Sequence, residues 1–278
     1  MKLNENSVIF GDKVILVPYR YIAPFSLIDW KLITCWMLQS RTCACELAYL
    51  SPCPAGAGSR GDNIRGRIEA DAGNAKEYHE WMKSLELLEL TASEPLSLGE
   101  EYKMQRKWLL DEDKLTFILL ARPSPPSDSS TGSSRYILQP EEIQKCRMVG
   151  DVNLFLPDGR EGEGECEIMI ASKEDRRKGY AVEALSLFLK YATSYLHLPA
   201  PQLLSRIGSQ NIPSIRLFKK LGFGVVKYVK VFDEVEMRFG QGDVEGMDLD
   251  YGVVEEGKEV DWEGAALEGR VGVYEAGV

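Results

Sequence analysis

The chain has 278 residues, 44% hydrophobic content and a formal net charge of -10 at pH 7. A chain of this length can bury a full hydrophobic core. Residues 241–278 hold eleven carboxylates against two basic residues, so this segment carries nearly all of the net charge. The remaining sequence is almost neutral and has no clustered basic face. We therefore expect no nucleic-acid partner, because binding to phosphates needs grouped lysines and arginines.

The N-terminus, MKLNENSVIFGDK, has no basic region followed by an apolar run, so it predicts neither a secretory signal nor a membrane anchor. The most apolar window, residues 21–38, contains Asp29 and Lys31 and is short for a bilayer span. Four of the six cysteines lie within residues 35–53, without paired Cys-x-x-Cys spacing and without a histidine among them. We therefore predict a cytoplasmic protein with no membrane segment and no metal site.

The first elements in chain order are a hairpin and an unusual segment. Residues 8–18, VIFGDKVILVP, place two β-branched runs around Gly11 and Asp12, which is typical of a hairpin. Residues 21–75 are first rich in cysteine and then in glycine and arginine, with no helical or strand period. We predict that 21–75 is an atypical, poorly ordered insert. It is either an artefact of the gene model, such as a translated intron, or a genuine insert that regulates access to the cleft.

Regular periodicity returns at residues 76–90, where Tyr78, Trp81 and Leu85 recur at helical spacing. A second helix is predicted to start at Ser97, which forms a capping-box pattern with Glu100. Residues 115–121, LTFILLA, have the composition of a buried strand. Residues 123–134 are rich in proline and serine and predict a flexible loop.

The second half contains more strands. Strands are predicted at 148–156, 166–171 and 203–207, and a terminal hairpin is predicted within 223–239. Helices are predicted from the basic turn near 176 to about 196 and over 212–222. This order indicates an α+β (mixed α/β) fold around one largely antiparallel sheet. We assign residues 1–20 and 76–240 to this domain, and we predict that the acidic residues 241–278 form a disordered tail.

The stretch KEDRRKGYAVEALSLFLK, residues 173–190, places basic residues and a glycine directly before a helix. Backbone N–H groups at a helix N-terminus, together with the helix dipole, favour an anion. Gly179 permits a left-handed backbone or close approach of a ligand, and Ala181 keeps the first helical turn small. The turn suits a pyrophosphate, although three exposed basic residues are also compatible with a solvated surface. A nucleoside triphosphatase loop is not supported, because G-x-x-x-x-G-K-[ST] is absent.

Two motifs resemble the GNAT superfamily of N-acetyltransferases. Residues 176–181, RRKGYA, match the pattern [RQ]-x-x-G-x-[GA] of its pyrophosphate turn. Residues 211–223, NIPSIRLFKKLGF, resemble its second signature, N-x-x-[SA]-x-x-[LM]-[YF]-x-K-x-G-F. More narrowly, segments such as MKLNENSVIFGDKVILVPYR, YHEWMKS and MVGDVNLFL are similar to the N-acetyltransferase 9-like proteins. The resemblance covers roughly residues 1–20 and 76–238 and omits the loop at 123–134.

The resemblance implies a GNAT fold, whose mostly antiparallel sheet splays open between the strand ending near Ile170 and the strand at 203–207. It also implies acetyl-CoA as cosubstrate and a protein or peptide amine as acceptor, with tubulin or microtubules as a partner. Pantetheine would bind backbone groups of Ile168 to Ala171, and Asn211 and Ser214 would lie near the cosubstrate. The residues that it assigns to cofactor binding are Ile168, Met169, Ile170, Arg176, Arg177, Lys178, Gly179, Tyr180, Ala181, Asn211 and Ser214.

Amide formation needs a neutral amine, so a general base is expected. Glu165 and Glu167 alternate with Cys166 on one strand, and if Cys166 faces the core both carboxylates point into the cleft. Glu167 is our first choice as the base, against the alternative that both are solvated surface carboxylates. Many relatives have a tyrosine acid where this chain has Phe218. The acid is then water, another residue such as Tyr228, or unnecessary, because a thiolate leaves readily.

Three functions remain open. The first is transfer of an acetyl group from acetyl-CoA to an α-amino group or a lysine of a protein. The second is a catalytically weak or inactive protein of the same fold that binds acetyl-CoA or a partner, for which Phe218 and the insert leave room. The third is acetylation of a small-molecule amine, which the same cofactor motifs would serve.

Overall fold

The computed structural model describes residue 4 and residues 7–19, 72–123, 137–245 and 259–273. The predicted insert at 21–75 lies outside the described residues except for its last four, and so do the four grouped cysteines and the loop at 124–134. The α-helices are α3 (Ala72–Trp81), α4 (Leu85–Leu90), α5 (Leu98–Leu110), α6 (Pro140–Ile143), α7 (Tyr180–Tyr195) and α8 (Ile212–Lys220).

The strands form one sheet in the order β7-β8-β6-β5-β4-β3-β2-β1-β9. They are β1 (Ser7–Phe10), β2 (Val14–Pro18), β3 (Lys114–Ala121), β4 (Met148–Phe155), β5 (Gly164–Ile170), β6 (Leu203–Gly208), β7 (Phe223–Val229), β8 (Glu234–Phe239) and β9 (Val271–Val273). The predicted hairpins at both ends of the domain are confirmed, and so is the antiparallel pair β4–β5. The sheet is therefore mostly antiparallel, as the sequence predicts.

One pair of strands departs from this pattern. β5 and β6 run parallel, and their pairing is limited to Gly164 with Leu203 and Glu165 with Leu204. β5 continues to Ile170 and β6 to Gly208 without pairing to each other. The sheet consequently splays open beyond Glu165, which confirms the predicted splay.

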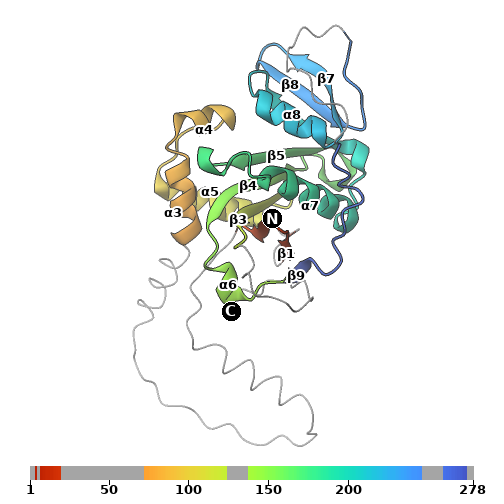
Figure 1. Cartoon of the computed structure of the whole chain (residues 1–278). Helices are drawn as coiled ribbons and strands as arrows, with labels where there is room; N and C mark the ends of the chain where they lie inside the picture. The colour runs from red at the N-terminus through yellow and green to blue at the C-terminus, as the bar shows by residue number, and fades with distance from the viewer. Residues whose placement is uncertain (1–3, 5–6, 20–71, 124–136, 246–258, 274–278) are drawn as a thin grey trace, which may run out of the picture.

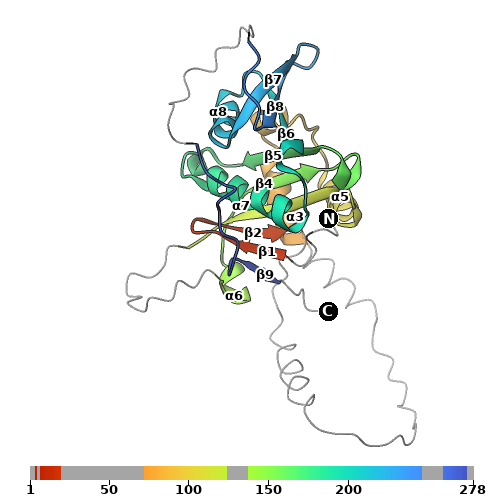
Figure 2. The ribbon, with the colours of Figure 1, turned by 90° about the vertical axis from the view of Figure 1, so that its right-hand side faces the viewer.

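Helices cover the two faces of the sheet differently. Figure 1 shows α3, α4 and α5 on one side and α7 on the other, while α8 packs with β7 and β8 beyond the splay. Figure 2, turned by 90°, shows α8, β7 and β8 at one end of the molecule and β1 and β9 at the opposite edge of the sheet. No helix in the described part of the chain has the length and apolar content needed to span a bilayer.

Two apolar clusters hold these layers together. The larger cluster packs one face of β3, β4 and β5 against α7 and includes Phe117, Cys166 and Phe188. The smaller cluster packs the other face against α3 and α4 and includes Tyr19 and Tyr78. Both sides of the sheet are therefore buried, and the helices fix the faces to which the β5 side chains point.

The helix starts follow local sequence signals. The carboxylate of Glu100 accepts the backbone N–H of Ser97 at 2.8 Å, which confirms the predicted capping box of α5. The predicted single helix over 76–90 is instead two helices. Ser84 has an extended backbone and its hydroxyl accepts the N–H of Leu87, so it starts α4 as a new helix after α3 ends.

The C-terminal segment differs from the predicted disordered tail, because residues 259–273 return to the domain. Trp262 is 2% exposed, packs on Phe239 and donates its indole N–H to the carbonyl of Leu221 at 3.0 Å. β9 pairs antiparallel with β1. The acidic composition of the tail conceals these two contacts, because a single tryptophan and three strand residues give no apolar period.

Candidate functional site

The turn between β5 and α7 has an unusual backbone. Arg177 has φ of 63° and Gly179 has φ of 85°, so two residues of the turn are left-handed. Gly179 is the N-cap of α7. Only glycine adopts this conformation without strain, which explains the glycine of the RRKGYA stretch. Left-handed residues in such a turn help to direct neighbouring N–H groups toward one concave surface.

These N–H groups have no acceptor in the part of the chain that the structure describes. The hydrogen bonds around the turn begin with Glu183, whose N–H donates to Gly179 O at 3.2 Å. None is found for the N–H groups of residues 177–182. Unpaired donors at a helix start form an anion site, and here they fit a group of the size of a pyrophosphate.

A buried carboxylate fixes the base of this turn. Asp175 is 2% exposed and binds both Nη1 and Nη2 of Arg147, at 2.5 and 2.8 Å. Lys178 Nζ donates to Asp175 Oδ1 at 3.0 Å. The hydrogen bond from Arg147 holds the pKa of Asp175 at about 2, and Lys178 contributes in the same direction. The turn therefore stays anchored across the neutral pH range.

Two of the basic side chains of the turn, Arg176 and Lys178, form ion pairs with carboxylates of the protein. Arg176 Nη1 lies 2.8 Å from Glu86 Oε1 on α4, and Lys173 Nζ lies 2.5 Å from Glu86 Oε2. Arg177 is exposed and has no carboxylate partner among the described residues. Arg176 and Lys178 thus hold the turn to the protein, and the predicted anion contacts rest mainly on the backbone.

The backbone of β5 alternates between its two neighbouring strands. The N–H of Ala171 donates to Val149 O at 3.0 Å, so by alternation the backbone groups of Met169 also face β4. Those of Ile168 and Ile170 then face the splay toward β6. Of the three β5 residues predicted to bind the cosubstrate through their backbone, Ile168 and Ile170 are oriented for it and Met169 is directed to β4.

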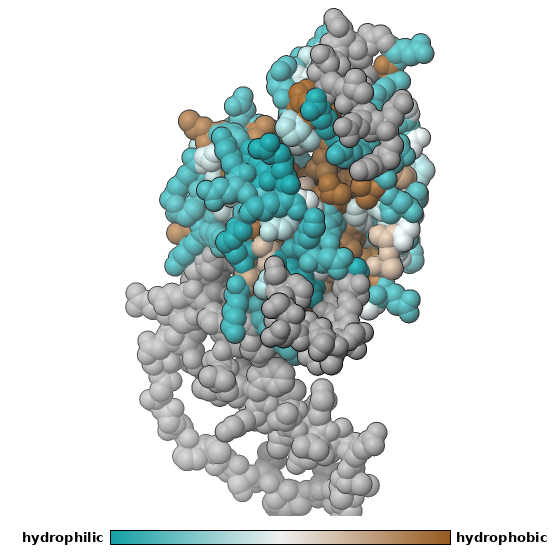
Figure 3. All heavy atoms as spheres, viewed as in Figure 1, coloured by the Kyte–Doolittle hydropathy of each residue, from teal (hydrophilic) through white to brown (hydrophobic). Residues whose placement is uncertain are grey.

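Apolar side chains line the region around the splay. Half-buried residues of β5, α7 and α8 pack at the edge of the larger cluster: Ile168, Ile170, Tyr180, Ile212 and Leu217. Figure 3 shows apolar surface between the body of the molecule and its α8 end, next to a largely hydrophilic surface over α3 to α5. An extended ligand with a thin apolar arm and an anionic end suits this arrangement.

The two β5 carboxylates lie as predicted on the face opposite the larger core. Cys166, between them, is fully buried in the larger cluster, whereas Glu165 is half-buried and Glu167 is exposed. Glu165 Oε2 accepts a hydrogen bond from Arg206 Nη1 at 2.5 Å. Arg206 also binds Glu236 at 3.3 Å.

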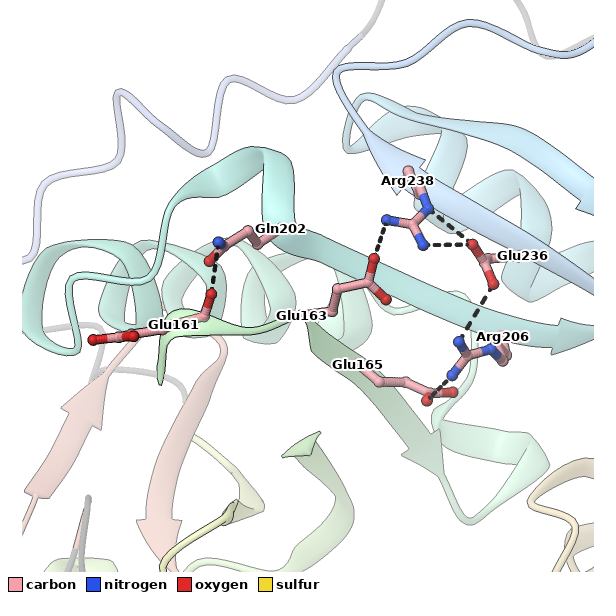
Figure 4. A network of polar contacts seen from close by, with 7 residues as sticks. All are labelled: Glu161, Glu163, Glu165, Gln202, Arg206, Glu236 and Arg238. Carbon is pink, nitrogen blue, oxygen red and sulfur yellow. Dashed lines mark hydrogen bonds and ion pairs between the residues drawn. The ribbon is translucent and has the colours of Figure 1, made fainter. Parts of the chain in front are cut away.

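Figure 4 shows this network at the closed end of the splay, where it joins β5, β6 and β8. Arg238 on β8 extends the network, because it binds Glu236 at 2.7 Å and Glu163 at 2.6 Å. Gln202 adds a bond from Nε2 to the carbonyl of Glu161 at 3.1 Å. β5 and β6 share only two ladder pairs, and the network adds side-chain contacts between them. Glu165 belongs to this network, so its carboxylate already has a partner, Arg206.

Glu167 differs from Glu165 in its surroundings, because no ion pair involves it among the described residues. Solvent reaches its carboxyl from one side, but the surrounding protein removes enough water to raise its pKa to about 7, and Glu165 adds to this effect. It lies just beyond the last β5–β6 pair, where the splay begins. A carboxylate with this pKa can accept a proton from an amine near neutral pH.

Buried polar groups surround Glu167 on the same face of the sheet, and sequence reasoning missed them. Asp151 is 2% exposed, its Oδ2 accepts from Asn153 at 2.9 Å, and burial raises its pKa to about 6. Lys114 Nζ lies 3.1 Å from the ring centroid of Trp108, and burial lowers the pKa of Lys114 to about 8. The sequence contained a signal for these groups, because polar residues occur at alternate positions of otherwise apolar strands.

Tyr228, the predicted candidate acid, is not close to Glu167. Its side chain packs against the larger cluster, on the other face of the sheet. Its hydroxyl donates to Asp233 Oδ1 at 2.6 Å, and this bond raises the pKa of Tyr228. Phe218 is 1% exposed and packs edge-on against Phe223, so it is part of the core.

The residues at the start of α8 have a structural role. Asn211 is the N-cap, and its side-chain oxygen accepts the N–H of Ser214 at 3.3 Å. Both residues are half-buried. This capping contact uses the side-chain oxygen of Asn211 and leaves its amide nitrogen for another contact.

Comparisons with known proteins agree with this geometry. The sequence model of the Acetyltransferase (GNAT) domain matches residues 68–224. The N-acetyltransferase 9-like protein of Schizosaccharomyces pombe is 43% identical over 188 residues, which are 58% of this chain and 85% of that protein. Alpha/beta-tubulin-N-acetyltransferase 9 of Homo sapiens is 36% identical over 239 residues, which are 86% of this chain and 85% of that protein.

The similarity to solved structures is lower. A spermidine N-acetyltransferase from Vibrio cholerae, in complex with CoA and spermine, is 17% identical with a TM-score of 0.47. The match covers 60% of this chain and 88% of that chain. Assignment to a family rests on the sequence matches, which cover more than half of the chain at higher identity.

Proposed function

Since the chain belongs to the GNAT acetyltransferase family and is an N-acetyltransferase, we propose that it transfers the acetyl group of acetyl-CoA to the α-amino group of a protein. The observation that carries this proposal is the unpaired set of backbone N–H groups at residues 177–182, at the start of the helix that follows β5. When bound, acetyl-CoA supplies an activated acyl group. A protein acceptor is supported by the relatives, three of which are named alpha/beta-tubulin-N-acetyltransferase 9.

We assign the cosubstrate contacts as follows. The N–H groups of Arg177 to Ala181 bind the pyrophosphate, and the backbone of Ile168 and Ile170 binds the pantetheine arm. Tyr180 contributes apolar surface at the same place. The half-buried Asn211 and Ser214 lie at the start of α8 and border the arm from the other side of the splay.

Glu167 acts as the general base. Its pKa of about 7 is close to that of an α-amino group, near 8, and far from that of a lysine, near 10.4. Proton transfer from an α-ammonium to Glu167 is thus uphill by only about one pK unit, and the amine becomes nucleophilic near neutral pH. Tyr228 is not retained as the acid, because its side chain packs against the larger cluster and its hydroxyl is bound to Asp233. The thiolate leaves readily without an acid.

Tubulin is the acceptor that we propose to test first, and it would place the enzyme in the cytoplasm. The purified chain is incubated with acetyl-CoA and peptides that carry the N-termini of α- and β-tubulin, and acetylation is read by mass spectrometry. Matched peptides with a blocked α-amine and one internal lysine separate the two acceptor classes. The proposal expects acetylation of the free α-amine. Cosubstrate binding without transfer to either peptide class would contradict it.

A further inference from the structure

The turn between β1 and β2 is held by a carboxylate from α7. Glu183 accepts hydrogen bonds from three consecutive backbone N–H groups, those of Asp12, Lys13 and Val14, at 2.8, 2.7 and 2.8 Å. Gly11 belongs to the same contact, because a Cβ at this position would lie 2.7 Å from Glu183 Oε2. The hairpin turn is therefore fixed against the first turn of α7.

Two arginines hold the same turn from its other sides. Arg122 Nη1 donates to the carbonyl of Gly11 at 2.8 Å. Arg270, just before β9, donates to the carbonyl of Phe10 at 3.2 Å and binds the carboxylate of Asp12. A turn with this many fixed backbone groups has little conformational freedom, so the side chain that it carries starts from a defined position.

That side chain is Lys13, and it crosses to the pyrophosphate turn. Lys13 Nζ donates to the carbonyl of Lys178 at 3.2 Å. It also lies over the left-handed residue of the turn, because a Cβ built on Gly179 would be 2.7 Å from Lys13 Nζ. The ammonium therefore lies beside Gly179, the N-cap of α7, on the carbonyl side of the Lys178–Gly179 peptide.

The charge of Lys13 is available to a ligand, unlike two other charges at this turn. Arg176 is paired with Glu86, and Lys178 is paired with Asp175. Lys13 Nζ donates its hydrogen bond to a neutral carbonyl, and the Lys13 ammonium has no carboxylate partner within the described ranges. Two further donors of an ammonium group remain for another acceptor.

We propose that Lys13 is a cosubstrate-binding residue, whose ammonium contacts a phosphate oxygen of the diphosphate, and that Glu183 positions it through the hairpin backbone. This inference rests on the proposed use of acetyl-CoA. The site then combines backbone donors from α7 with one mobile cation from the N-terminal hairpin. Sequence motifs miss Lys13, since it lies far from residues 176–181 in the chain.

Calorimetric titration with ligand analogues tests the assignment without a turnover assay. Lys13→Ala is titrated with acetyl-CoA and with its 3′-dephospho analogue, which retains the diphosphate. Loss of one charge-assisted hydrogen bond at an exposed lysine raises Kd about tenfold. We expect this same factor for both ligands. A factor seen only with acetyl-CoA would assign Lys13 to the 3′-phosphate and overturn the diphosphate contact.

Two further variants separate the possible outcomes. Lys83→Ala removes an exposed lysine paired with Glu80 on α3, and its Kd should equal that of the wild type. Glu183→Gln should weaken binding, and adding Lys13→Ala to it should weaken binding by less than in the wild type, because the two residues act together. If the wild type binds neither ligand, the proposed function fails. If it binds and Lys13→Ala stays within twofold, only this inference fails.

Discussion

The two faces of the sheet around β4 and β5 differ in how many charged side chains they carry. Toward α7 the strands present Phe117, Leu154 and Cys166, all fully buried and apolar. Toward α3 and α5 the same strands present charged groups with shifted pKa values, among them Asp151 and Glu167. The first face gives stability. The second holds ionisable groups at a cost in stability, which is the usual condition of a reaction site.

The largest effect expected from this contrast is on catalysis. Glu167→Gln keeps the size of the side chain and removes the proton acceptor, so kcat/KM should fall by about 10²- to 10⁴-fold. The Kd for acetyl-CoA should change by less than twofold, since the cosubstrate is assigned to backbone groups. Glu165→Gln is the matched control on the same face, and it should retain at least about a tenth of the activity because Glu165 is bound to Arg206. Equal losses in both variants would contradict the assignment.

The next effect concerns the apolar face. Phe117 is fully buried and packs edge-on against Phe188 and Tyr191. Phe117→Ala leaves a cavity against α7 and should lower the free energy of unfolding by about 3–5 kcal/mol. Denaturant unfolding followed by circular dichroism measures this value. A cost below about 1 kcal/mol would mean that this face does not carry the stability of the sheet.

The smallest expected effect is a gain in stability, and it comes from a substitution on the polar face. Burial raises the pKa of Asp151 to about 6, so its charged form is disfavoured in the folded chain. Its contribution to stability is complete at low pH and is lost as the pH rises through 6. Asp151→Asn removes this loss and keeps an acceptor for Asn153.

The wild type and Asp151→Asn should therefore be compared at pH 4 and pH 8. From the lower to the higher pH, the variant should gain up to about 3 kcal/mol of unfolding free energy relative to the wild type. Thermal or urea unfolding at both pH values measures this difference. Groups that titrate equally in both proteins do not contribute to it. If the difference in unfolding free energy between the two proteins were the same at both pH values, the pKa of Asp151 would not be shifted.

The same contrast explains what the sequence predicts and what it does not. The pyrophosphate turn is contiguous, so residues 176–181 reveal its basic residues, its glycine and the helix that follows. The apolar pattern likewise predicts β4, β5 and the helix α7 within a few residues. The side on which Glu165 and Glu167 lie follows from strand alternation alone.

Contacts between distant segments escaped prediction, since no local pattern encodes them. Lys114 and Asp151 come from different strands, and their shifted pKa values arise from α5 and the sheet packing around them. Trp262 enters the core from an acidic segment whose composition indicates disorder. Glu86, on the short helix α4, forms an ion pair with Arg176. The charge of Arg176, which the sequence analysis assigns to ligand binding, is therefore paired within the protein.

The pH dependence of acetyl transfer tests the account most directly. Single turnovers at saturating acetyl-CoA, with an α-amine peptide as acceptor, are measured from pH 5 to pH 9 for the wild type and Glu167→Gln. The account predicts a wild-type rate that falls about tenfold per pH unit below about pH 7, where Glu167 is protonated, whereas in the variant the fall begins at about pH 8, where the α-amine itself is protonated. A limb of the same position and slope in both proteins would show that another group accepts the proton, and would contradict the assignment of the polar face.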